Sequence, residues 1–300
     1  MVHSLAINQS TRYTLNNQRK IPVIGYGVYD VAKEQTAELV YQALSVGYRL
    51  IDTAVVYGNQ LEVAMGIARF LKEADVPRNE IFFTTKLWNS QQGYNETKNA
   101  LKEMRADLIP YIGYIDLILL HSPLTSSEKR LGTWKALEEA VENPAEAAIE
   151  IHSIGVSNFG IEHLEELLQV AKIKPVVDQL ELHPWLPRIR LREYLKRHAI
   201  LAEAYSPLTQ GFKLEDPELL LLEKDGGCSK TDLLLKWSLL QEFVVVVKSN
   251  KLERMAQNLA VLPKKKGVVS LTDHQWDVFH KPDSHEVVTW GNSDPTVYTR

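Results

Sequence analysis

The stretch "RLIDTAVVYGNQLEVAMGIARFL", residues 49–71, contains the unit from which the fold of this chain can be predicted. Residues 48–52, "YRLID", form a short run around an apolar centre that ends in Asp52, and such a run is too short for a helix. Residues 60–71 instead show the spacing of an amphipathic helix. The residues expected on its buried stripe are Leu61, Ala64, Met65, Ala68 and Leu71. The stretch therefore predicts a buried strand followed by a helix.

The same alternation recurs about eight times along the chain. The apolar runs are "PVIGYG" (22–27), "YRLID" (48–52), "IFFTTK" (81–86), "YIDLILLH" (114–121), "IHSIGVSN" (151–158), "PVVDQLEL" (175–182), "AILAEAYS" (199–206) and "FVVVVKS" (243–249). Continuous rather than alternating hydrophobicity is typical of parallel strands that are covered on both faces. Segments with helical spacing lie between the runs, and no Pro/Gly/Ser-rich linker divides the chain. We therefore predict an α/β fold, a single (β/α)8 TIM barrel domain over residues 1–300.

Three segments fall outside this repeat. Residues 12–24 have the character of a β-hairpin, with Asn16 and Asn17 at the turn. Residues 209–227, "TQGFKLEDPELLLLEKDGG", are predicted to be an insertion after the seventh strand. Residues 281–300 contain Pro, Asp, Ser and Gly without periodicity, and we predict an irregular tail.

The composition narrows the possible functions. The formal charge of the 300 residues is -4 without a basic tract, which argues against nucleic acid or an anionic membrane as partner. Cys228 is the only cysteine, so neither a disulfide framework nor a thiolate metal site is expected. Closely paired histidine ligands are also missing from the sequence, and we predict no metal. The sequence shows neither the basic-then-apolar pattern of a signal peptide nor an apolar run of membrane-spanning length. We therefore expect a cytoplasmic monomer or weak dimer that acts on a small molecule.

Polar residues close several of the predicted strands. Asp52, Lys86 and His121 each end an apolar run, and Tyr57 follows Asp52 by five residues. Others in such positions are Ser157, Asn158, Ser206, Lys248 and Ser249, with Gln179 inside its run. The carboxyl ends of all strands of a barrel meet on one face, which carries the active site. Helix capping would explain a single Asp or Ser, but Lys is not a capping residue. The pattern therefore predicts a functional site.

These side chains suggest the reduction of a carbonyl group. A phenol has a pKa of about 10, and a nearby ammonium lowers it, so Lys86 is expected to make Tyr57 a better acid. Asp52 can hold Lys86, and His121 can donate a hydrogen bond to a carbonyl oxygen. No metal or flavin motif supplies the electron pair, which leaves a hydride cofactor. A Rossmann site is not its source, because Gly25-x-Gly27 lacks the third glycine of that motif.

The sequence resembles the aldo-keto reductase family, and within it most closely the xylose reductase and carbonyl reductase-like branch. The similar motifs are "LIDTAVVYGNQ", "FFTTKLWNS", "DLILLHSP", "SIGVSNFG", "QLELHPW", "AYSPL" and "VKSNKLERMAQN", in the order of the family from about Gly25 to Asn258. The resemblance implies Asp52, Tyr57, Lys86 and His121 as a catalytic tetrad, with Tyr57 as proton donor. It also implies NADPH as cofactor.

The resemblance implies roles for further residues. Those expected to bind the cofactor are Ser157, Asn158 and Gln179 at the carboxamide, Tyr205 on the nicotinamide ring, Ser206 and Leu208 along the pyrophosphate, Lys248, Ser249, Asn250 and Arg254 at the 2′-phosphate, and Gln257 and Asn258 at the adenine. Tyr29 and Trp88 are expected to line the substrate pocket. The sequence departs from the family pattern at Asp178, where Asn is commoner, and at Gln257, which replaces a common Glu.

Two other functions remain open at this point. Lys86 could form a Schiff base in a barrel lyase, although the segment around Lys248 and Arg254 would then have no role. Alternatively, the chain could bind NADPH as a non-catalytic regulatory subunit, against which the intact tetrad argues.

Overall fold

Eight parallel strands close into a barrel in the computed structural model, which describes residues 2–299 apart from the side chains of Val2 and Asp225 and the exposure of Gly226. The strands are β4 (Ile24–Gly27), β5 (Leu50–Asp52), β6 (Phe82–Leu87), β7 (Leu117–Leu120), β8 (Ile154–Ser157), β9 (Val177–Glu181), β10 (Leu201–Tyr205) and β11 (Val244–Val247). They follow one another around the barrel in sequence order, and β11 pairs with β4 to close it. Each predicted apolar run coincides with one of these strands, with β6 ending one residue beyond its run, so the predicted barrel is confirmed.

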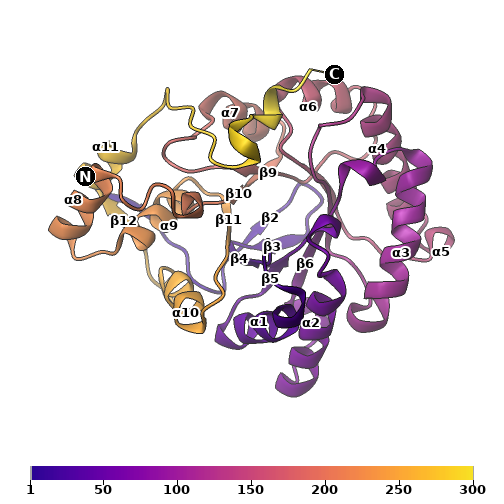
Figure 1. Cartoon of the computed structure of the whole chain (residues 1–300), viewed down its shortest axis with the longest axis horizontal. Helices are drawn as coiled ribbons and strands as arrows, with labels where there is room; N and C mark the ends of the chain where they lie inside the picture. The colour runs from indigo at the N-terminus through magenta and orange to yellow at the C-terminus, as the bar shows by residue number, and fades with distance from the viewer. Residues whose placement is uncertain (1, 300) are drawn as a thin grey trace.

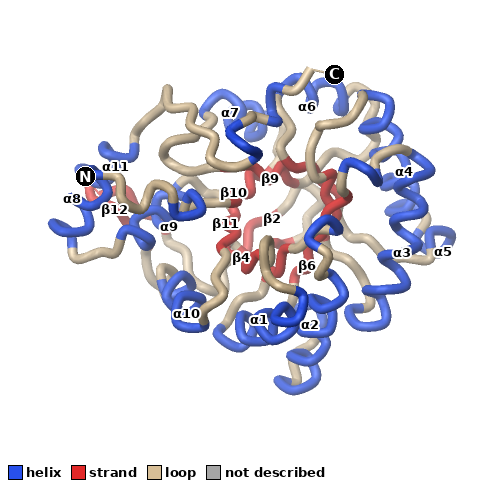
Figure 2. Tube along the Cα trace, viewed as in Figure 1, coloured by secondary structure: helices blue, strands red, loops and turns tan. Residues whose placement is uncertain are grey.

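Helices surround the strands, as Figure 2 shows with the strands in red and the helices in blue. They are α1 (Lys33–Val46), α2 (Gln60–Ala74), α3 (Tyr94–Ile112), α4 (Ser127–Glu142), α5 (Pro144–Ala147), α6 (Ile161–Leu168), α7 (Ile189–Arg197), α8 (Pro217–Gly226), α9 (Lys230–Leu240), α10 (Leu252–Ala260) and α11 (Asp273–Phe279). The predicted insertion after the seventh strand contains α8. The Asp216 side chain caps this helix by accepting hydrogen bonds from the backbone N–H groups of Glu218 and Leu219.

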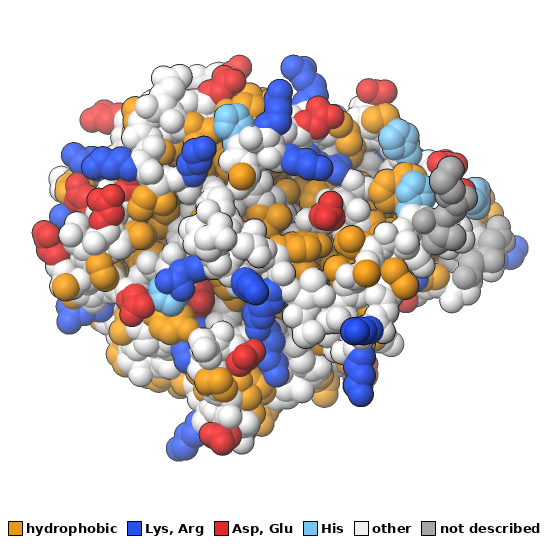
Figure 3. All heavy atoms as spheres, turned by 180° about the vertical axis from the view of Figure 1, so that it is seen from behind, with side chains coloured by type: hydrophobic (Ala, Val, Ile, Leu, Met, Phe, Trp, Pro, Cys, Tyr) orange, Lys and Arg blue, Asp and Glu red, His pale blue; other side chains and the backbone are white. Residues whose placement is uncertain are grey.

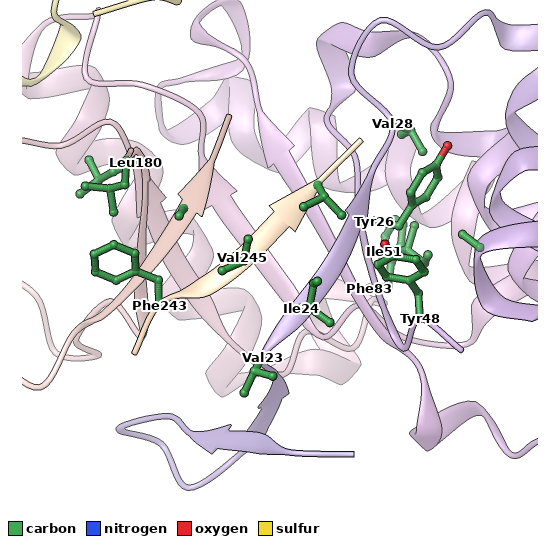
Figure 4. Close-up of a cluster of buried hydrophobic side chains, with 14 of the residues drawn as sticks. Val23, Ile24, Tyr26, Val28, Tyr48, Ile51, Phe83, Leu180, Phe243 and Val245 are labelled. Atoms are coloured by element: carbon green, nitrogen blue, oxygen red, sulfur yellow. The ribbon is translucent and has the colours of Figure 1, made fainter. Parts of the chain in front are cut away.

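The strands are apolar on both faces, which explains their continuous hydrophobic runs. On the outward face, side chains of neighbouring strands such as Tyr26, Ile51 and Phe83 pack together under the helices (Figure 4). On the inward face, Leu50, Phe82, Leu117, Leu119, Val177 and Val244 form a second buried cluster with the hairpin residues Leu15 and Ile21. Because side chains alternate along a strand, Asp52 and Lys86 share the inward face with Leu50 and Phe82.

The predicted hairpin is confirmed and closes the amino-terminal end of the barrel. Strands β2 (Arg12–Thr14) and β3 (Lys20–Pro22) pair antiparallel. At the turn, Asn16 Nδ2 donates to the carbonyl oxygen of Pro175 at 2.9 Å and Asn17 Nδ2 donates to Ser153 Oγ at 3.0 Å. Since Pro175 and Ser153 precede strands β9 and β8, the hairpin leaves the opposite end, with the carboxyl ends of the strands, for a site.

The buried stripe predicted for α2 is largely wrong, since of its five residues only Ala64 is fully buried. The buried residues of this helix are Val63, Ala64, Gly66, Ile67 and Phe70, whereas Met65 is 43% exposed. A Cβ atom on Gly66 would lie only 2.6 Å from the carbonyl oxygen of Ala37, so this face of α2 lies directly against α1. The segment is apolar on more than one stripe, and the close contact at Gly66 decides which stripe is buried.

A small two-stranded sheet lies outside the barrel and was not expected. β1 (Val2–Leu5) pairs antiparallel with β12 (Val269–Thr272), which precedes α11.

Charged side chains of both signs are scattered over the face shown in Figure 3. Within residues 2–299, no helix combines the length and apolar character that a membrane span requires.

The tail after α11 is irregular as predicted, with two short 3-10 turns at Trp290–Asn292 and Pro295–Val297. It runs from α11 past α7 toward α6, and is yellow in Figure 1. The buried ion pair of Arg188 and Asp294 fixes it, with an N–O distance of 2.9 Å. The carbonyl oxygen of Tyr298 also lies 2.6 Å from His163 Nε2. These contacts tie the tail to the barrel beside its carboxyl-terminal end.

Candidate active site

Lys86 and Asp52 form a buried ion pair at the carboxyl ends of β6 and β5. Lys86 Nζ donates to Asp52 Oδ1 at 2.6 Å and to the carbonyl oxygen of Thr53 at 2.9 Å. Their side chains are only 1% and 5% exposed. Two acceptors therefore hold the ammonium group in one place, and the carboxylate compensates for its burial.

Tyr57 and His121 lie against this pair. Tyr57 ends the 3-10 turn Val55–Tyr57, which follows β5, and Gly58 continues the chain in the left-handed conformation with φ of 68°. Lys86 Nζ lies 5.2 Å from the centroid of the Tyr57 ring. The His121 ring meets the Tyr57 ring edge-on, with centroids 5.7 Å apart. Asp52, Lys86 and His121, which the sequence places at three separate strand ends, are thus neighbours of one another and of Tyr57.

Burial keeps both Tyr57 and His121 in their neutral forms. The pKa of Tyr57 is raised well above its usual value, first by burial and then by the negative charge of Asp52. The lowering of this pKa by Lys86 that the sequence predicts is wrong, because burial disfavours the phenolate and Asp52 offsets the charge of Lys86. The pKa of His121 is lowered well below its usual value by burial and by the charge of Lys86. No hydrogen-bond partner of His121 Nδ1 exists in the described part of the chain.

Three aromatic side chains surround Tyr57 and His121. The predicted pocket residue Tyr29 is 57% exposed and meets Tyr57 edge-on at 5.2 Å, and Trp88 meets His121 at 4.9 Å. The third is Trp290 of the tail, which stacks on Trp88 with centroids 6.0 Å apart and an interplanar angle of 12°. Sequence reasoning missed Trp290, because the tail has no periodicity that would place it at the barrel mouth.

A hydrogen-bonded chain connects Trp290 with His121. Trp290 Nε1 donates to the Tyr205 hydroxyl at 2.9 Å, which donates to Asn158 Oδ1 at 2.8 Å. Asn158 Nδ2 donates in turn to the carbonyl oxygen of His121 at 2.9 Å. This chain fixes the tail against two residues that were predicted to hold the nicotinamide.

Gln179 and Ser157 complete this side of the site. Gln179 Nε2 donates to Asp52 Oδ2 at 2.8 Å, and Ser157 Oγ donates to the carbonyl oxygen of Gln179 at 2.8 Å. Ser206 follows β10 in the left-handed conformation with φ of 50°, and Leu208 packs against the core two residues later. The predicted carboxamide residues therefore lie beside the tetrad, and Gln179 is bonded to it.

The residues predicted for the adenosine end form a separate group at the end of β11 and in α10. Lys248 Nζ donates to the carbonyl oxygen of Asp30 at 3.1 Å, and Ser249 Oγ accepts from the backbone N–H of Lys251 at 3.1 Å. Asn250, Arg254 and Gln257 are exposed and Asn258 is buried. Arg254 has no ionic partner within residues 2–299.

These donor sets suit a nicotinamide dinucleotide. Amide and hydroxyl groups beside the tetrad match the donors and acceptors of a carboxamide. Two cations and neutral donors next to the start of α10 match a phosphate group, since a helix N-terminus also attracts anions. Within residues 2–299, no cluster of three or more His, Cys, Asp or Glu side chains could hold a metal ion.

Comparisons with known proteins identify the family of this chain. Residues 23–276 match the model of the aldo/keto reductase family. The chain is 41% identical to an uncharacterized oxidoreductase of Saccharomyces cerevisiae, over 94% of this chain and 98% of that one. It is 40% identical to the glyoxal reductase of Bacillus subtilis, over 81% of this chain and 84% of that one.

The fold is also that of a solved member of the family. An aldo/keto reductase from Brucella melitensis superposes with a TM-score of 0.78 at 33% identity, over 91% of this chain and 99% of that one. The family model covers all the strands that carry the tetrad. This chain therefore belongs to the aldo/keto reductase family and is an oxidoreductase that acts on carbonyl compounds.

Proposed function

We propose that this protein reduces an aldehyde or ketone to the alcohol with NADPH, and that Tyr57 donates the proton. The observation that supports this most is the buried Asp52–Lys86 pair, which lies against the Tyr57 ring next to His121. A phenol, a neutral imidazole and a fixed ammonium group are what the protonation of a carbonyl oxygen requires.

Each residue of the tetrad has a separate task in this reaction. The Tyr57 hydroxyl and the neutral His121 ring hold the carbonyl oxygen by hydrogen bonds. NADPH, when bound, supplies the hydride for the carbonyl carbon. Tyr57 gives its proton to the oxygen as negative charge develops there, and Lys86 stabilises the resulting phenolate. The raised pKa of Tyr57 keeps the proton on the phenol until that charge appears.

The preference for NADPH over NADH is assigned to Lys248 and Arg254. The guanidinium group of Arg254 offers forked donors to a 2′-phosphate, and Lys248 offers a compact charge. The exposure of Arg254 and the absence of an ionic partner for it within residues 2–299 support this role. Lys248 is already bonded to the backbone of Asp30, so its position is fixed before a phosphate binds.

The pocket walls favour a small, flat carbonyl compound. Trp88 and Trp290 stack on each other and both meet the His121 ring edge-on, while Tyr29 meets the Tyr57 ring edge-on. The glyoxal reductase relative makes α-dicarbonyls the first class to test. A Schiff-base lyase is less well supported, since Lys86 Nζ is bound by two acceptors and buried.

A turnover assay tests the proposal. NADPH absorbance is followed with glyoxal-type dicarbonyls, aromatic aldehydes, α-keto esters and aldoses, in parallel with NADH. We expect turnover with NADPH and a small carbonyl compound, and weaker turnover with NADH. Turnover that needs no nicotinamide cofactor, or borohydride trapping of a substrate on Lys86, would contradict it.

A further inference from the structure

Glu203 is a buried acid inside the barrel to which the proposed reaction gives no task. It occupies the middle of β10, its exposed fraction is 0%, and it is the register partner of Gln179 on β9 and of Val244 on β11. Side chains alternate along a strand, so Glu203 shares the inward face of β10 with Leu201 and Tyr205. It therefore lies in the barrel interior, on the same side of the strands as the tetrad.

The carboxyl group of Glu203 has no fixed partner. Neither of its oxygens has a hydrogen-bond partner in the described part of the chain. The side-chain amide of Gln179 on the neighbouring strand is nevertheless close enough to favour the ionised form of this carboxyl group. Burial, followed by the negative charge of Asp52, raises the pKa of Glu203 to about 8, while Lys86 and Gln179 oppose this rise. An ionised carboxylate without partners in this interior would be costly, so the neutral acid is favoured at neutral pH.

Gln179 connects Glu203 with the tetrad. Its side-chain amide donates to Asp52 Oδ2 at 2.8 Å, while Asp52 Oδ1 accepts from Lys86. A single amide thus stands between a neutral acid on one side and the catalytic ion pair on the other. Ionised Glu203 would be a stronger acceptor for this amide than neutral Glu203.

We propose that Glu203 is a positioning residue of this site. As a neutral acid it leaves Gln179 bonded to Asp52. When ionised, it weakens that contact and adds a negative charge near Lys86. This inference rests on the proposed reductase function and deepens it. The added charge makes phenolate formation at Tyr57 less favourable, because part of the stabilisation by Lys86 is cancelled. Ionisation of Glu203 should therefore slow carbonyl reduction on the alkaline side.

The other groups around Glu203 define which titrations could be mistaken for its own. The titratable groups that face the barrel interior around it are Glu181 on β9, Asp52 on β5, Lys86 on β6 and Tyr205 on β10. Gln179 on β9 and Val244 and Val246 on β11 also face it, but they do not titrate. Glu181 is paired with His183 and with the tail at Thr289, and its pKa is lowered. The pKa of Tyr205 is raised by burial, far above the pH range in which Glu203 titrates.

The first test compares pH profiles of kcat/KM for the wild type and Glu203→Gln, with NADPH saturating. The amide imitates the neutral acid at every pH, so the alkaline decline should move up by about one pH unit or more and the variant should be about tenfold faster than wild type at about pH 9. Activity near neutral pH should change less. An active Glu203→Gln enzyme with the wild-type alkaline decline would overturn the inference.

Asp178→Asn provides the matched control. Asp178 precedes Gln179 on β9, is fully buried and also has a raised pKa, but it points outward, where Oδ1 accepts from the backbone N–H of Phe159. This variant should keep the wild-type pH profile. If it moved the alkaline decline as far as Glu203→Gln does, the effect would be a general one of buried acids and the inference would be wrong.

An infrared titration gives a readout that does not depend on activity. In the Asp178→Asn background, the carbonyl stretch of a protonated carboxyl group should be present near neutral pH and disappear over the range in which reduction slows. The measurement needs no Glu203 variant, so it remains decisive if Glu203→Gln does not fold. A carboxyl band that is absent near neutral pH would overturn the inference. Lack of any carbonyl reduction by wild type would instead contradict the proposed function.

Discussion

Replacing Lys86 with Met should destabilise the protein strongly, because it leaves a buried carboxylate without its cation. Asp52 is 4% exposed and would keep only the hydrogen bond from Gln179, and the carbonyl oxygen of Thr53 would also lose its donor. Removing one partner of a buried ion pair costs about 3–5 kcal/mol. We therefore expect the free energy of unfolding of Lys86→Met to fall by about this amount at neutral pH.

A double-mutant cycle with Asp52→Asn separates the ion pair from simple loss of packing. The double variant has no buried charge at this place, so it should be more stable than the sum of the two single changes predicts, by about 2 kcal/mol or more. Urea unfolding followed by both fluorescence and circular dichroism gives the four free energies and shows whether each transition is two-state. Changes that add to within about 0.5 kcal/mol would refute the reasoning, since the two side chains would then not be coupled.

Three further changes test other parts of the mechanism and the site. Arg254→Ala should weaken NADPH binding by about ten- to a hundredfold and NADH binding far less, as measured by fluorescence titration. Equal losses for both cofactors would contradict the assignment of Arg254 to the 2′-phosphate. Trp290→Phe keeps the stacking but loses the hydrogen bond to Tyr205, which is worth about 0.5–1.5 kcal/mol. KM for small carbonyl compounds should therefore rise less in this variant than in Trp290→Ala. Equal effects of the two substitutions would mean that the ring does not line the pocket. The folded pKa of Glu203 lies above its unfolded value, so its burial lowers stability as pH rises from about 4.3 through about 8. The difference in unfolding free energy between Glu203→Gln and wild type should therefore grow in favour of the variant across this window, and a constant difference in urea titrations would count against the raised pKa.

The barrel and the tetrad could be predicted because their signals are local. Each strand is buried on both faces, which leaves a continuous apolar run, and Asp52, Lys86 and His121 stand where those runs end. The convergence of strand ends in a barrel then brings them together without any information on distances. The same local pattern was not enough for α2, where two apolar stripes compete and the contact of Gly66 with α1 decides between them.

The parts that could not be predicted depend on contacts distant in sequence. Trp290 reaches the site because several contacts, among them the Arg188–Asp294 ion pair and its own hydrogen bond to Tyr205, fix an unpatterned tail beside the barrel mouth. The direction of the Tyr57 pKa shift depends on how deeply the ring is buried and on how fully Asp52 neutralises Lys86. Residue types alone indicate that such effects can occur, but they specify neither the burial nor the pairing.

Single-turnover reduction by Tyr57→Phe is the most direct test of the central claim that Tyr57 is the proton donor. The substituted ring keeps its packing between Tyr29 and His121 and loses only the hydroxyl group. General acid catalysis contributes about 10²–10⁴-fold, so the rate of reduction should fall by that factor while the affinity for NADPH, titrated on the same sample, stays close to that of wild type. If Tyr57→Phe with intact NADPH binding kept more than about a tenth of the wild-type rate, another group would be the proton donor.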